Sequence, residues 1–228
     1  MRERPILMSG PMALACHNGT KTMTRRVVKP QPPEHVDALR QSAVDPAEWI
    51  DRDGINFGVC CPYGVPGDRL WVRETFVEIA GRAWHRAGGN LHWNGEPYTG
   101  RWTPSIHMPR WACRTVLEIT DVRVERLQEI TDADAVAEGF TASMMHPQIV
   151  VMCEDGGTYS MHGDAGNDVP RIGDGDGGRK VVHVQHVPAS VLTTAREMFA
   201  VTWRTIYGAD SWSANPWVWV VSFKKVLP

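Results

Sequence analysis

The chain has 228 residues, 43% of them hydrophobic and 22% charged, which is the composition of an ordinary globular protein with enough apolar residues for a core. Its formal net charge of -2 lacks the basic excess of proteins that grip duplex DNA or RNA by the phosphates. We expect a cytoplasmic protein without membrane contact, because no apolar run approaches the roughly 18 residues of a membrane span, the start MRERPILMSGPMALAC is a poor signal peptide, and an odd number of cysteines is a poor disulfide framework.

The first 28 residues predict a strand, a helix and a second extended segment. Pro5–Met8 has the composition of a short strand. A helix follows, with Ser9 or Gly10 as its cap, and it is expected to end at Gly19. Residues 20–28 are rich in threonine and valine, which favours extended structure.

The middle of the chain is predicted to be rich in β-structure. Residues 30–53 are loop-like, and 46–50 are compatible with a short helix. The elements that follow are a turn cluster CCPYGVPGD (60–68), a strand RLWVRETF (69–76), hairpin-like pieces over 82–103, a loop SIHMPRW (105–111) and the longest strand, CRTVLEITDVRVERL (113–127).

The last part of the chain combines two helices, an insertion and a final strand. A capping box at Thr131 opens a short helix that Gly139 ends. Residues 141–187 are glycine-rich and acidic in places, so we interpret them as a partly flexible insertion within a single domain. Residues 189–207 predict a helix that places Val191, Leu192, Met198, Phe199, Trp203 and Ile206 on one side. Residues 215–226 predict a strand buried on both faces. This order favours an α+β domain around a mostly antiparallel, barrel-like sheet.

The stretch GTKTMTRR at 19–26 is the strongest local concentration of positive charge near the start of the chain. One interpretation is a catalytic or ligand-binding edge, in which Arg25 and Arg26 lower the pKa of Lys21 or hold a phosphate. The other is a solvated basic edge that binds phosphate without catalysis.

Glu74 is expected on the apolar face of its strand, together with Leu70 and Val72. It either lines a pocket and accepts a hydrogen bond from a cytosine amino group, or forms a salt bridge with Arg69 or Arg73.

Trp71 and Trp111 are candidates for stacking on a base, although we favour core packing for both. The loop at 105–111 offers Ser105, His107 and Arg110 for contacts with a phosphate or a base, and packing of this loop against the barrel explains those residues almost as well.

Five motifs in order give the chain a resemblance to a known family. They are G-x-K-T-x-T-R-R, PGDRLWVRE, VLEITDV, T-x-x-D-A-x-x-E-G and NPWVWVVSFK, and together they run over about 5–140 and 189–225. In this respect the chain resembles the ASCH domain, and more narrowly the phage and prophage branch that carries SIHMPRW. The resemblance implies a PUA-like β-barrel with flanking helices. It also implies a pocket for RNA, or for a single modified nucleoside.

Some small bacterial members of that family are amidohydrolases that remove the acyl group from N4-acetylcytidine. Their catalytic lysine, threonine and glutamate correspond by motif to Lys21, Thr24 and Glu138. The resemblance therefore implies that Thr24 acts as nucleophile or positions a water, that Lys21 acts as its base, and that Glu138 orients the lysine or carries the proton.

Three functions stay open at this level. The first is an amidohydrolase acting on an N4-acylated cytosine or a similar base. The second is a non-catalytic module that reads a nucleoside or single-stranded nucleic acid, RNA rather than duplex DNA, with Arg25, Arg26, Trp71, Glu74, Ser105, His107 and Arg110 as binding residues. The third is a ribonuclease. We expect no metal and no cofactor, because Cys60 and Cys61 have no recognised zinc spacing with a histidine, and GDGDGG at 173–178 lacks the glutamate that ends a calcium loop.

Overall fold

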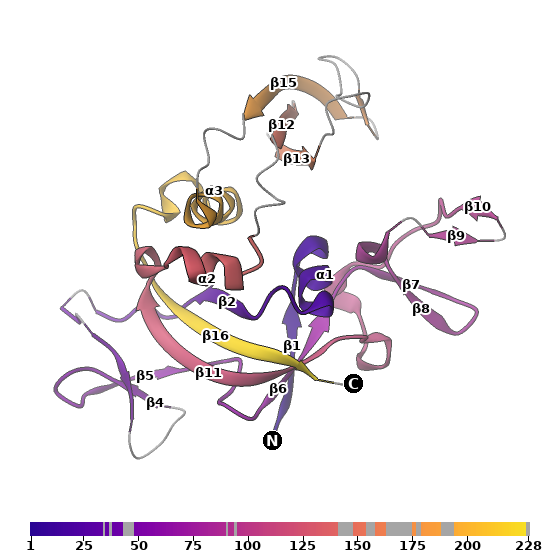
Figure 1. The fold of residues 1–228 in the computed structure, drawn as a ribbon. Helices are drawn as coiled ribbons and strands as arrows, with labels where there is room; N and C mark the ends of the chain where they lie inside the picture. Colours follow the sequence, from indigo (N-terminus) through magenta and orange to yellow (C-terminus); the bar gives the residue numbers. More distant parts are fainter. Residues whose placement is uncertain are drawn as a thin grey trace. The chain divides into compact units, whose positions relative to one another are not determined.

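The computed structural model describes residues 1–33, 35–36, 38–42, 48–89, 91–93, 95–140, 148–153, 158–162, 175–176, 179–187 and 194–226 (Figure 1). Of residues 57–59, 93 and 148–187 only the backbone is described. The chain divides into two compact units, one made of 1–139 with 210–228 and the other of 140–209.

The larger unit is built around one twisted sheet, whose described strands follow the order β1-β6-β11-β16-β2. The neighbours are antiparallel except β1 and β6, which run parallel. Figure 1 shows β11 and β16 as the long curved pair at its centre. The sheet strands are β1 (Glu3–Leu7), β2 (Met23–Val27), β6 (Arg69–Arg73), β11 (Val116–Arg126) and β16 (Trp217–Val226).

The central strand β16 explains where the core lies. Its first five residues, Trp217 to Val221, are all buried, as expected for a strand covered on both faces. Trp219, Val221 and Phe223 join the main core cluster, which also holds Leu70 of β6 and Ile119 of β11. The prediction of a final strand buried on both faces is therefore confirmed for the first half of β16.

Two helices of this unit begin and end where the sequence signals indicate. Helix α1 (Gly10–Asn18) has Ser9 as N-cap and a left-handed Gly19 at its end. Helix α2 (Asp132–Ala137) has Thr131 as N-cap, and the Thr131 hydroxyl accepts a hydrogen bond from the Asp134 main-chain N–H. Figure 1 shows α2 beside β2, and residues of the two elements are in contact.

Short strands and 3₁₀ turns surround the main sheet. Strands β3, β4 and β5 form one small sheet, while β7 pairs with β8 and β9 with β10. Their bounds, with those of the turns, are β3 (Arg40–Gln41), β4 (Glu48–Ile50), β5 (Asn56–Cys60), β7 (Phe76–Ile79), β8 (Arg82–His85), β9 (His92–Trp93), β10 (Glu96–Pro97), η1 (Arg86–Gly88), η2 (Ser105–His107), η3 (Arg110–Ala112), η4 (Leu127–Glu129) and η6 (Ala209–Ser211). The short helix expected at 46–50 is wrong for Glu48–Ile50, because β4 pairs with its neighbours and Trp49 packs edge-on against Trp219. Residues 46 and 47 lie outside the described part.

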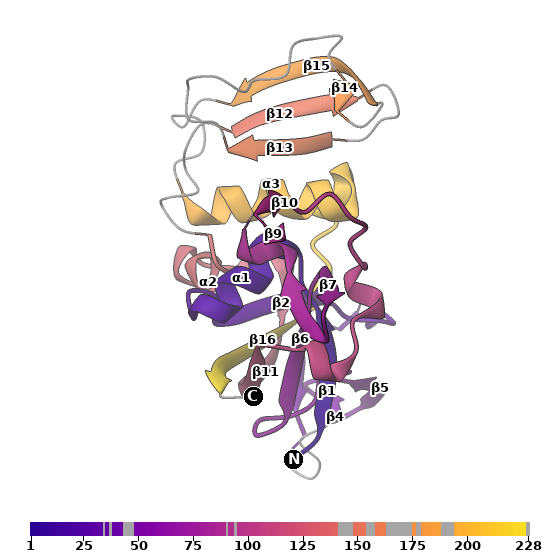
Figure 2. The same ribbon diagram turned by 90° about the vertical axis from the view of Figure 1, so that its right-hand side faces the viewer.

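The described residues of the smaller unit form an antiparallel sheet and the helix α3. The sheet order is β13-β12-β15-β14, from β12 (Gln148–Cys153), β13 (Thr158–His162), β14 (Gly175–Asp176) and β15 (Arg179–Val187). Figure 2 shows β12 between β13 and β15. Helix α3 (Ala195–Tyr207) is capped by Thr194 and buries Met198, Phe199 and Trp203. Ile206 was expected on the same buried side but is 66% exposed, and Val191 and Leu192 lie outside the described residues. Much of 141–187 also lies outside them, so the flexibility of that segment stays a prediction.

The class expected from the sequence, α+β with mostly antiparallel strands, is confirmed. None of the helices in the described part of the chain has the length and apolar character that a bilayer crossing requires.

Candidate functional site

A buried ion pair joins residues from two of the motifs that carry the resemblance, Lys21 and Glu138. The Lys21 ammonium donates to Glu138 Oε2 at 2.5 Å and to the Glu138 main-chain oxygen at 2.7 Å. Lys21 is 3% exposed and Glu138 is 4% exposed. The interpretation of this stretch as a solvated basic edge is therefore wrong for Lys21.

Main-chain hydrogen bonds explain why these two residues meet. Thr22 donates its N–H to the carbonyl of Ala137, the last residue of α2, at 2.8 Å. The Thr22 carbonyl in turn accepts from the N–H of Phe223 in β16 at 2.8 Å. The residue just before β2 therefore bridges the end of α2 and the central strand, and Lys21 is held against the C-cap residue Glu138.

Hydrogen-bonding capacity is left over in this pair. An ammonium group has three N–H bonds, and that of Lys21 uses two of them within the described residues. The other carboxylate oxygen of Glu138, Oε1, is buried without a hydrogen-bond partner there. The Arg25 guanidinium lies beside this oxygen, with Nη1 at 3.8 Å. A buried acceptor without a hydrogen bond is unusual in folded proteins. It is explained either by a functional role or by a water molecule that binds there.

Thr24 lies on β2, paired with Val221 of β16, and is fully buried. Its Oγ1 accepts a hydrogen bond from Arg26 Nη1 at 2.9 Å. Within the described part of the chain, the Thr24 hydroxyl proton has no acceptor. Thr24 therefore keeps a free O–H near the start of β2, and Lys21 lies just before this strand.

Arg25 belongs to an internal network of charges. Its side chain is 0% exposed, and Nη2 donates to Glu125 at 3.1 Å and to Asp134 at 3.0 Å. Arg123 bonds the same two carboxylates. Burial raises the pKa of Asp134, but the Thr131 N–H and the Arg25 and Arg123 charges outweigh it and lower that pKa overall. Arg25 thus organises α2 and β11 and does not present itself to a phosphate.

Cys16 of α1 lies in the same neighbourhood, which the sequence did not suggest. Burial raises the pKa of its thiol to about 11. The charges of Lys21 and Arg26 lower that pKa, while those of Glu138 and Glu74 raise it. Cys16 itself is fully buried and belongs to the main core cluster. In the sequence it resembled any other apolar position of the helix.

Glu74 is 1% exposed at the end of β6, and its carboxylate is fully engaged. Both oxygens accept from Arg114, each at 2.9 Å. The sequence had offered Arg69 or Arg73 as a salt-bridge partner, and neither is the one observed. Arg114 is brought here because β6 pairs with β11, with Trp71 opposite Val116.

The remaining candidates lie outside this buried cluster. Arg110 forms two hydrogen bonds with the exposed Glu3 of β1, and Ser105 and His107 belong to the turn η2. Trp71 is half-buried and packs against a small core cluster, as favoured from the sequence, with the Arg73 guanidinium 5.4 Å from its ring. For Trp111 the expectation of core packing is wrong, because that side chain is 56% exposed.

Comparison with known proteins adds no assignment. No family model, curated protein or solved structure matches the chain. Among the described residues there is also no group of three or more His, Cys, Asp and Glu side chains that could hold a metal ion. The side chains brought together here could support proton transfer within the Lys21–Glu138 pair and nucleophilic attack by the Thr24 hydroxyl.

Proposed function

We propose that the chain is an ASCH protein with a PUA-like barrel, and that it hydrolyses the amide of an N4-acylated cytidine or a similar modified base. The contact between Lys21 and Glu138 carries the proposal. These residues come from two of the five motifs on which the resemblance rests, and they lie 117 positions apart in the chain. A shared catalytic task accounts for two charged groups that are removed from water and left with unused hydrogen-bonding capacity.

The reaction follows from the groups at the site. Transfer of a proton from Lys21 to Glu138 leaves a neutral amine, which can take the proton of Thr24 or of a water that Thr24 holds. The resulting oxygen attacks the acyl carbonyl, and the ammonium N–H not used by Glu138 stabilises the oxyanion. Collapse of this intermediate breaks the C–N bond, and the proton passes to the departing amino nitrogen. With Thr24 as nucleophile, a water then cleaves the acyl ester, so that one water is consumed and a free base and a carboxylic acid are released.

The test is incubation with N4-acetylcytidine, with mass detection of cytidine and acetate. Thr24→Val keeps the shape of the side chain and removes the hydroxyl, and Glu138→Gln keeps the shape and removes the charge. We expect each to lower kcat by about 10²–10⁴-fold, the usual contribution of one acid–base or nucleophilic group. Lys224→Ala, which removes an exposed partner of Glu118, serves as the control and should keep full activity. Unchanged turnover in Thr24→Val and Glu138→Gln would exclude this mechanism.

A binding module without catalysis is the second candidate, and one observation favours it. Thr24 is completely buried and already accepts a hydrogen bond from Arg26, whereas a nucleophile must reach its substrate. Under this alternative the buried pair stabilises the fold, and RNA or a modified nucleoside binds nearby. Absence of turnover, together with RNA binding that weakens as salt rises, would support it.

A further inference from the structure

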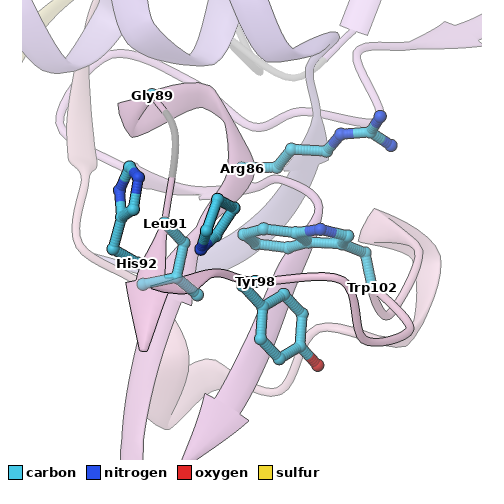
Figure 3. Close-up of a pocket in the computed structure, with 7 residues that line it drawn as sticks. Arg86, Gly89, Leu91, His92, Tyr98 and Trp102 are labelled. Carbon is cyan, nitrogen blue, oxygen red and sulfur yellow. The ribbon is translucent and has the colours of Figure 1, made fainter. Parts of the chain in front are cut away.

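A hollow lies in the larger unit, and neither Lys21 nor Glu138 is among the described residues that line it. It has a volume of about 370 Å³ and is formed by the turn η1, the β9–β10 hairpin and the segment that follows (Figure 3). Two aromatic, two apolar and two basic side chains line it, namely Tyr98, Trp102, Leu91, Pro97, Arg86 and His92. No carboxylate is among the described residues that line it.

The aromatic part of this hollow is held in place by its neighbours. Tyr98 meets Trp102 edge to face, with ring centroids 5.6 Å apart and an angle of 84° between the planes. The Tyr98 main-chain N–H donates to the Leu91 carbonyl at 2.7 Å, which ties the two sides of the hairpin together. Trp102 stays half-buried, so part of the indole is open to a ligand.

The basic part is available for an anion. Arg86 is exposed, and within the described part of the chain its guanidinium makes no ion pair or hydrogen bond. Figure 3 shows the Arg86 side chain extending on the same side of the hollow as Trp102, with His92 on the other side. The backbone beneath is fixed, since the Arg86 N–H donates to the carbonyl of Thr75 at 2.9 Å.

We propose that this hollow binds a nucleotide, with the base stacked on Trp102 and the phosphate bound by Arg86. An aromatic ring next to an unpaired guanidinium provides the two contacts that single nucleotides use, stacking and charge-assisted hydrogen bonding. The volume is near the lower end of ligand pockets, which fits one nucleotide better than a larger cofactor. The nucleotide is either free in solution or one unit of a single strand. The proposal does not depend on catalysis by Lys21, Thr24 and Glu138.

Calorimetry with AMP, adenosine, inorganic phosphate and a short oligoadenylate strand tests the proposal. We expect AMP to bind more tightly than adenosine or phosphate, because only AMP makes both contacts. Trp102→Ala should weaken AMP at least about fivefold, the lower bound for loss of one base–aromatic stack. Arg86→Ala should lower the affinity for AMP to that for adenosine. Raised salt should lower the AMP affinity of the unchanged protein in the same way.

Matched controls come from the neighbouring strand β8, which offers an exposed tryptophan and an exposed arginine outside the hollow. Trp84→Ala and Arg82→Ala should leave AMP binding unchanged, and so should Thr24→Val, which separates this site from the proposed catalytic one. If the oligoadenylate binds and AMP does not, and if Trp102→Ala and Arg86→Ala both weaken that binding, the nucleotide in the hollow is one unit of a nucleic acid strand. Binding insensitive to both substitutions, or no binding of either probe, overturns the proposal.

Discussion

Lys21 Nζ lies 2.5 Å from Glu138 Oε2 although the two residues are 117 positions apart, and both side chains are removed from solvent. Such a pair contributes little net stability as a whole, because the cost of removing both charges from water offsets their attraction, but loss of one partner leaves an uncompensated buried charge. Any activity measurement on single variants therefore has to be accompanied by a stability measurement.

We expect Lys21→Met and Glu138→Leu each to lower the free energy of unfolding by about 3–5 kcal/mol. The double variant should be destabilised by clearly less than the sum, because neither charge is then left alone. Urea denaturation followed by circular dichroism measures all three. The pair of the exposed Lys224 and the half-buried Glu118 is the control, and its removal should change the free energy of unfolding by less than about 1 kcal/mol. Additive effects of the two buried substitutions would contradict the pairing.

Gly139→Ala should disturb the site through the backbone. Gly139 has a φ of +100°, which disfavours any residue with a Cβ, and a Cβ here would lie 3.4 Å from Lys21 Cβ. Gly19 has a φ of +78°, and a Cβ added there would meet no atom within 4 Å, so Gly19→Ala isolates the backbone effect. We expect about 1 kcal/mol of destabilisation for Gly19→Ala and more for Gly139→Ala. Equal losses in thermal or urea unfolding would show that the space beside Lys21 is not restricted.

Two arginine–glutamate pairs in this protein differ mainly in exposure and so form a matched comparison. Arg114 bonds the buried Glu74, whereas Arg110 bonds Glu3 with both side chains more than a third exposed. Arg114→Ala should cost about 3–5 kcal/mol of stability because it strands a buried carboxylate. Arg110→Ala should cost less than about 1 kcal/mol, since solvent screens that pair. Guanidinium chloride unfolding distinguishes the two, and similar losses would show that Glu74 is hydrated.

Cys16 should make stability depend on pH in the alkaline range. Burial raises the thiol pKa from 9.0 to about 11, so the unfolded chain ionises first as the pH rises. The resulting stability is fully present below pH 9 and is lost between pH 9 and about 11. Relative to Cys16→Ala, the native protein should lose about 2 kcal/mol over that interval, from linkage of about 2 pKa units. Unfolding under reducing conditions at pH 8 and 11 provides the measurement, and parallel curves for the two proteins would show that the thiol is hydrated.

Local signals in the sequence predict individual elements well. The capping box at Thr131, the left-handed stop at Gly19 and the unbroken apolar start of β16 each follow from contacts within a few residues, and each is found where expected. Such features depend on steric and hydrogen-bonding rules that act along the chain, so distant partners do not change them.

Features set by distant partners were predicted less well. The sequence around Trp49 contains good helix formers, yet burial against Trp219 and pairing with β5 make it a strand. Glu74 has two arginines close to it in sequence and pairs with a third, Arg114, because strand register decides which side chains meet. The Lys21–Glu138 contact was anticipated through the family resemblance. The charge network around Arg25 was not, since Glu125 and Asp134 lie about a hundred positions away.

The place of β16 between β11 and β2 has a consequence for synthesis. Because translation proceeds from the N-terminus, β2 and β11 emerge from the ribosome long before the strand that joins them. A nascent chain that stops before Trp217 carries Lys21 and Glu138 but lacks the Phe223 N–H that donates to the Thr22 carbonyl. The pairing of β2 with β16, and the hydrogen bond from Phe223 to Thr22, can therefore form only after these residues of β16 have left the exit tunnel, so the support of the buried pair from the central strand is added late in synthesis.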